Sequence, residues 1–154
     1  MTDHPVTDRA QLPTLFGRFS TVLQEHDQLR TTLVQLREMC TTLETEASAL
    51  PRELLPEPLF AELFSELKSH FACEESPAYF GTVVEEAPTL APQINTLKRE
   101  HHDMLIAIEQ LLGIAKDHSR WPALPHPTRQ FVAILERHER AESTLLRELF
   151  FPPR

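Results

Sequence analysis

The sequence predicts an all-α domain, and three observations carry this prediction. Leu, Glu, Arg, Thr and Ala dominate the 154 residues, whereas Gly occurs three times and Tyr once, which favours helices over sheets. The thirteen prolines leave four long segments without proline, and proline is the residue that helix interiors tolerate least. Within each segment apolar residues recur at alternating steps of three and four, as in helices packed in a left-handed bundle.

The proline-free segments set the order of the elements. They span 14–50, 59–76, 93–121 and 128–151, and we expect helices at about 14–50, 59–76, 93–120 and 128–150. The connections run from Pro51 to Pro58, from Pro77 to Pro92 and from Pro122 to Pro127; the middle one is the longest and is expected to carry a turn of structure. Short loops favour an up-down-up-down four-helix bundle. Residues 1–154 then form a single domain, of which 1–13 are an N-terminal extension.

Each expected helix has one apolar seam, and every seam contains a histidine. The first seam reads Phe19, Val22, His26, Leu29, Leu33, Leu36, Cys40, Leu43, and the second reads Phe60, Leu63, Leu67, His70, Glu74. The third reads Ile94, Leu97, His101, Leu105, Ile108, Leu111 or Leu112, Ala115, and the fourth reads Phe131, Ile134 or Leu135, His138, Glu142, Leu145, Leu149. His102 points about 100° away from His101, so the third seam selects His101.

Six polar side chains therefore occupy core positions: His26, His70, Glu74, His101, His138 and Glu142. Two pairs among them repeat a His-x-x-x-Glu spacing, which places a nitrogen and an oxygen donor on one helix face. At 1.5 Å per residue the four histidines fall within roughly 9–20 Å of the same end of the bundle. Burying an unpaired carboxylate costs several kcal/mol, and no Lys or Arg lies on the seams nearby. The sequence therefore predicts a bound cation.

Charge and composition exclude several classes of partner. The formal net charge of −8 is spread along the chain without a basic stripe, which argues against nucleic acid and anionic membrane surfaces. No apolar run is long enough for a membrane span, and the first residues lack a signal sequence. Two cysteines without a CxxC motif suit a reducing compartment, and we expect a cytoplasmic protein.

The motifs around these residues resemble those of hemerythrin-like, or HHE cation-binding, domains. The resemblance covers nearly the whole chain, and the stretches that carry it are 25–30, 70–75, 99–105 and 137–142, followed by 149–152. It implies a four-helix bundle that holds two Fe ions joined by a bridging oxo or hydroxo group, although Mn or Zn would also suit the ligands. By this resemblance His26 and His70 bind one iron, His101 and His138 bind the other, and Glu74 and Glu142 bridge them.

The chain departs from oxygen-carrying hemerythrins at two positions. They place a second histidine four residues after the one in the third helix, where this chain has Leu105, and an aspartate five residues after the last histidine, where it has Ser143. The resemblance is therefore closer to HHE domains that sense iron or oxygen. Some of these use an acidic residue directly after the second-helix histidine, where this chain has Phe71. Glu25, Glu75, Glu100 and Glu139 flank the histidines and could accept hydrogen bonds from them, although each also suits a solvated charge.

Three functions follow as hypotheses. The first is a non-haem di-iron protein that binds or senses dioxygen, reactive oxygen or nitrogen species, or iron itself. The second is a di-iron enzyme acting on peroxide, nitric oxide or ferrous iron. The third is a helical interaction module that uses metal structurally or not at all. We expect a small diatomic or oxidant ligand, and the sequence identifies no protein partner.

Overall fold

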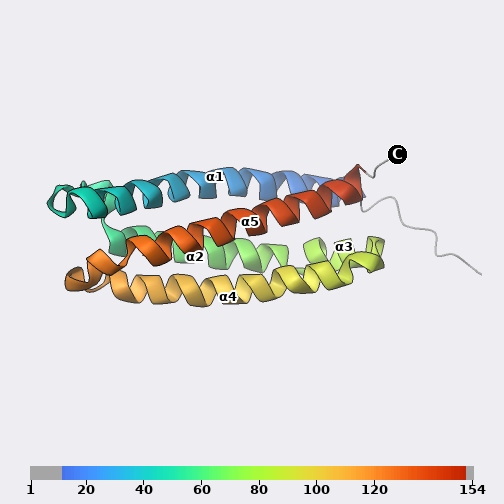
Figure 1. Cartoon of the computed structure of the whole chain (residues 1–154). Coiled ribbons are helices and arrows are strands. Elements are labelled where there is room, and N and C mark those ends of the chain that lie inside the picture. The colour runs from blue at the N-terminus through green and yellow to red at the C-terminus, as the bar shows by residue number, and fades with distance from the viewer. Residues whose placement is uncertain (1–11, 152–154) are drawn as a thin grey trace, which may run out of the picture.

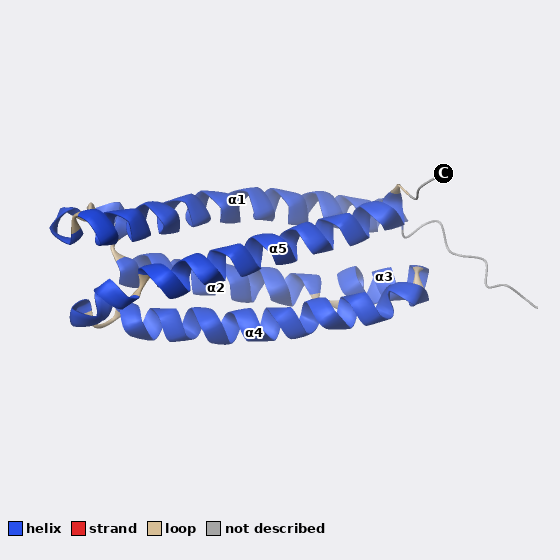
Figure 2. Cartoon of the chain, in the orientation of Figure 1, coloured by secondary structure: helices blue, strands red, loops and turns tan. Residues whose placement is uncertain are grey.

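The computed structural model describes residues 12–151, and all of its regular structure is helical. The α-helices are α1 (Leu12–Thr45), α2 (Pro56–Glu74), α3 (Thr82–Glu86), α4 (Ala91–Ala115) and α5 (Pro125–Phe150). The residues so described contain no strand (Figure 2). The four long helices lie side by side, and each long helix runs back along the one before it (Figure 1). The prediction of an all-α fold is confirmed.

The helix bounds differ from the expected ones at several helix starts and at the ends of α1 and α4. α2, α4 and α5 begin earlier than expected, because each carries a proline in its first turn, where the missing N–H costs no intrahelical bond. α1 ends at Thr45 rather than at 50, and short 3₁₀ turns follow at Ala47–Ala49 and Arg52–Leu54. α4 ends at Ala115 rather than at 120, before a 3₁₀ helix at His118–Ala123 that Asp117 caps. The expected extension 1–13 lies mostly outside the described residues.

The connection between α2 and α4 is more structured than the sequence predicted. A five-residue π-helical turn (Pro77–Gly81) leads directly into α3, and a 3₁₀ turn (Pro88–Leu90) leads into α4. Four helices were expected, so α3 is an addition to that prediction. The connection buries Tyr79, Phe80 and Val83, and thus continues the core beyond the end of α2.

The apolar core has two parts, separated along the bundle by a polar layer. One cluster includes Leu29, Leu67, Met104 and Leu135 and fills the longer part of the bundle. The other includes Val22, Leu97, Leu145 and the side chains of the α2–α4 connection. Each candidate histidine lies about one helical turn from a residue of the larger cluster, and Val22 and Leu97 of the other cluster lie one turn away on the opposite side. Apolar side chains therefore enclose the histidine layer from both ends.

The structure also decides the open seam positions. Leu111 and Leu135 are buried, whereas Ile134 is 43% exposed. The third seam was wrong at Leu105, which is only partly buried, whereas the neighbouring Met104 is buried in the core. Within residues 12–151 no helix has the length and apolar character to cross a membrane.

Candidate metal centre

The six polar side chains of the seams come together in two groups. One group consists of His26, His70 and Glu74, and the other of His101, His138 and Glu142. Within each group the possible ligand atoms lie within 4.8 Å of one another. All six side chains are buried, with exposed fractions of 4% or less, whereas the neighbouring His102 is exposed. Helix periodicity therefore identified which of the two adjacent histidines of α4 faces the interior of the bundle.

Glu74 lies between the two groups. Its Oε1 atom is 2.8 Å from Nε2 of His70 and 3.7 Å from Nε2 of His101. The Nε2 atom of His70 is in turn 3.2 Å from Nε2 of His26. A single carboxylate of α2 is therefore close to histidines of both groups, as a bridging ligand must be.

The outward nitrogens of three histidines meet carboxylates from neighbouring helices. The Nδ1–H groups lie against Glu25 for His70, against Glu75 at 3.4 Å for His101, and against Glu100 at 2.8 Å for His138. A histidine that donates from Nδ1 keeps a lone pair on Nε2, so these contacts fix the tautomer that can bind a cation. Three of the four acidic residues that the sequence placed beside the histidines thus contact them.

In four of these side chains, atoms that could bind a metal have no hydrogen-bond partner among the described residues. Both carboxylate oxygens of Glu74 and of Glu142, together with Nε2 of His101 and His138, are buried without a hydrogen bond among the residues described. Buried polar atoms of native proteins are almost always paired, and unpaired carboxylates are the most costly. Within each group, imidazole nitrogens and a carboxylate oxygen lie close together, and Fe, Mn and Zn ions bind this combination of ligands. The residues present therefore fit a metal centre.

Burial shifts the ionisation of these groups toward their neutral forms. It lowers the pKa of His26 and of His101 to about 3, with neighbouring histidines adding to the effect. Burial raises the pKa of Glu74 to about 8. It also raises the pKa of Glu142 well above its ordinary value, and the nearby Glu74 charge raises it further. The histidines are thus in the neutral form that binds a metal, whereas a bound cation would favour the ionised form of the carboxylates.

Aromatic side chains border the second group. The ring of Phe71 stacks on the ring of His101 at 3.9 Å between centroids, with 9° between planes. Phe80, from the α2–α4 connection, is nearly parallel to His101 at 5.9 Å. Tyr79 is buried, its hydroxyl has no hydrogen-bond partner within residues 12–151, and the charges of Glu142 and Glu74 add to burial in raising its pKa. The long connection therefore seals this end of the centre.

The fourth flanking acid, Glu139, differs from the other three. It is 6% exposed, it contacts none of the candidate ligands by hydrogen bond, and its Oε1 atom has no partner. Burial raises its pKa to about 7, although His70 and Arg30 oppose that rise. Glu139 lies on no predicted seam, because α5 is also buried along the side that faces α1, and the seam of one face does not show that contact.

Comparison with known proteins agrees with this geometry. The family model for the hemerythrin HHE cation-binding domain matches residues 18–149, which include all six candidate ligands. The chain belongs to the hemerythrin HHE family. Neither a curated protein nor a solved structure matches it at a significant level.

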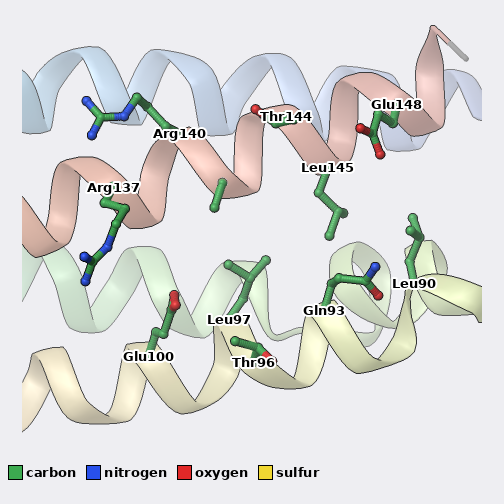
Figure 3. A pocket seen from close by; sticks show the side chains of 11 residues that line it. Leu90, Gln93, Thr96, Leu97, Glu100, Arg137, Arg140, Thr144, Leu145 and Glu148 are labelled. Atoms are coloured by element: carbon green, nitrogen blue, oxygen red, sulfur yellow. The ribbon is translucent and has the colours of Figure 1, made fainter. Parts of the chain in front are cut away.

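In this hemerythrin HHE domain the outer carboxylates connect the buried histidines to the surface. Glu100 points from α4 into a groove between α4 and α5 with a volume of about 560 Å³, which Arg137 and Arg140 border from α5 (Figure 3). Glu25 lines a second surface cavity of about 340 Å³ together with His70. His70 and His138, although buried, are thus each one hydrogen bond from solvent.

Proposed function

We propose that this hemerythrin HHE domain is a non-haem di-iron protein that binds or senses dioxygen, reactive oxygen or nitrogen species, or iron itself. The observation that carries the proposal is the pair of buried His-His-Glu groups, in which the carboxylate oxygens of Glu74 and Glu142 and Nε2 of His101 and His138 have no hydrogen-bond partner among the described residues. Apolar clusters enclose these groups, and a cation of high charge would compensate the carboxylates in their ionised form.

The geometry supports one assignment of ligands. His26 and His70 would hold one iron and His101 and His138 the other, because each pair belongs to one compact group. Glu74 and Glu142 would bridge the two ions, together with an oxo or hydroxo group derived from solvent. Two nitrogens, two carboxylate oxygens and this group would supply five ligands to each iron, which would leave one position for a small ligand. Manganese or zinc would use the same donors.

Metal analysis and absorption spectroscopy test this proposal. The protein is purified aerobically, its metal content per chain is measured, and visible spectra are recorded before and after azide addition and after reduction. About two irons per chain, with charge-transfer bands that azide alters and reduction removes, would support a di-iron centre. A colourless protein that takes up no iron, manganese or zinc would rule it out. Glu74→Ala is expected to abolish binding of the metal pair, whereas Glu109→Ala, on the exposed face of α4, is the matched control.

A second candidate is an enzyme that dismutes hydrogen peroxide, converting two peroxide molecules into two waters and dioxygen. This reaction moves protons between substrate molecules and needs no external reductant. The solvent-accessible Glu25 and Glu100, each in contact with a candidate ligand, offer places to hold such protons. Oxygen evolution from peroxide by the iron-loaded protein tests this function. Tight ligand binding without turnover would favour the sensor.

A further inference from the structure

The candidate centre has an approximate two-fold symmetry. The pair Glu25-His26 on α1 corresponds to Glu100-His101 on α4, and the His-x-x-x-Glu motif of α2 corresponds to that of α5. The contacts correspond as well, since His70 of α2 meets Glu25 of α1, and His138 of α5 meets Glu100 of α4. Positions that break this symmetry distinguish one half of the centre from the other.

The residue that follows the histidine of each motif breaks the symmetry most clearly. It is Phe71 on α2 and Glu139 on α5, and both side chains are buried. Phe71 stacks on His101, which belongs to the other group. The symmetry therefore places the Glu139 side chain on the side of His26, where the nearby charges include His70 and Glu142.

Within the part of the chain that the structure describes, Glu139 forms no ion pair, although the charge of the nearby Arg30 lowers its pKa. Its Oε1 atom is enclosed without a hydrogen bond, and no ion pair to the nearby Arg30 forms, because that guanidinium bonds Asp27 at 2.7 Å. Glu139 and the neighbouring acid Glu136 both border a cavity of about 350 Å³ between α1 and α5, and Glu136 is paired with Arg37. An unpaired buried carboxylate beside a cation-binding group is expected to face the cation.

We propose that Glu139 is a further carboxylate donor of the metal held by His26 and His70. The proposal rests on the proposed function, since it requires metal in that group. Glu139 is not one of the six side chains whose donors converge within 4.8 Å, so metal binding would draw its carboxylate inward by rotation of the side chain. The two metals then differ. Glu139 would fill the sixth position of the first metal, whereas the second, beside Phe71, would keep an open position for a small ligand.

Cobalt(II) titration of the full chain tests this assignment with a readout that does not depend on activity. Wild-type protein, Glu139→Gln and the control Glu136→Gln are each titrated with Co²⁺, and both stoichiometry and visible absorption are measured. Gln keeps the shape and a hydrogen-bond acceptor but loses the anionic donor, so it would preserve a purely structural role. Glu139→Gln should still bind two ions, one of them at least about tenfold more weakly. It should also show stronger absorption bands, as Co²⁺ loses a ligand. Glu136→Gln should match the wild type.

Azide binding to the iron-loaded protein provides a second measurement. The wild type should bind one azide per metal pair, and Glu139→Gln should bind two, because removal of the carboxylate opens the first metal. If Glu139→Gln matches the wild type in cobalt affinity, spectrum and azide stoichiometry, the assignment of Glu139 is wrong while the metal centre stands. If the wild type binds no metal, the proposed function fails together with this assignment.

Discussion

The Nδ1–H of His138 donates a hydrogen bond to Oε2 of Glu100, 2.8 Å away on the neighbouring helix. This contact orients the imidazole so that Nε2 points inward, toward Glu142 at 3.8 Å. A carboxylate in this place also makes the histidine a stronger ligand, because it stabilises the positive charge that the ring acquires on binding a cation.

Removal of the Glu100 carboxylate should weaken binding of the metal ion that His138 is proposed to hold. We expect Glu100→Ala to lower affinity for one of two metal ions by roughly 10–100-fold, whereas Glu100→Gln, which still accepts the hydrogen bond, should lose less. Competition with a chelator of known affinity measures both. Equal affinities for wild type and Glu100→Ala would show that the contact has no part in metal binding.

The choice between adjacent histidines on α4 can be tested directly. His101 is 1% exposed and faces Glu74, while His102 is exposed to solvent. His101→Ala should reduce the metal content from two ions to one or none, and His102→Ala should leave it at two. Elemental analysis of the purified variants distinguishes the cases, and the reverse pattern would mean that the register of α4 is wrong.

The stability of the metal-free protein should depend on pH in both directions. The pKa of Glu74 is raised to about 8, so the folded state retains a proton that the unfolded chain has released, and stability falls as pH rises from about 4.5 to 8. The pKa of His26 and of His101 is lowered to about 3, so stability also falls as pH drops from about 6.5 to 3. Each group contributes at most about 1.4 kcal/mol per pH unit.

Urea denaturation at a series of pH values measures this dependence. The metal-free protein should be most stable at about pH 6, where the two windows overlap and the opposing effects offset each other. Metal should abolish the loss above pH 6.5, because it holds the carboxylates ionised and the histidines neutral. A metal-free protein whose stability is constant from pH 6.5 to 8 would contradict the buried state of Glu74.

Substitution of Tyr79 tests whether its buried hydroxyl interacts with the metal centre. It has no hydrogen-bond partner in the structure, so Tyr79→Phe should raise the stability of the metal-free protein by about 1 kcal/mol. If a ligand of the metals accepts a hydrogen bond from this hydroxyl, the same substitution should shift the absorption spectrum of the loaded protein. Thermal unfolding and visible spectroscopy separate the two effects, and loss of stability in the metal-free form would instead indicate a packing role.

The larger core cluster should tolerate change least. Leu36 is fully buried in α1, and Leu36→Ala should lower the free energy of unfolding by about 2–5 kcal/mol through lost burial and the cavity left behind. Val34 on the same helix is 50% exposed, and Val34→Ala should change it by less than about 1 kcal/mol. Chemical denaturation of both variants provides the comparison.

Proline explains both the success and the error of the predicted helices. Clusters of proline separate the four long helices, because an interior proline breaks the hydrogen-bond ladder. The same residues, Pro56, Pro92 and Pro125, lie inside the first turns, so the expected starts came two to three residues late. The short helix α3 was not predicted, because its five residues are too few to show a periodic pattern.

The sequence by itself determined which histidine and glutamate of each helix face inward, since a 3.6-residue period fixes the side of a helix from which a residue projects. The inward positions of His101 and Glu142 needed nothing further. Only the tertiary structure decided which side chains meet between helices. That His138 contacts Glu100, that Phe71 covers His101, and that Glu139 is buried without a partner all depend on how neighbouring helices are rotated and offset. The pattern along one helix carries no information about these quantities.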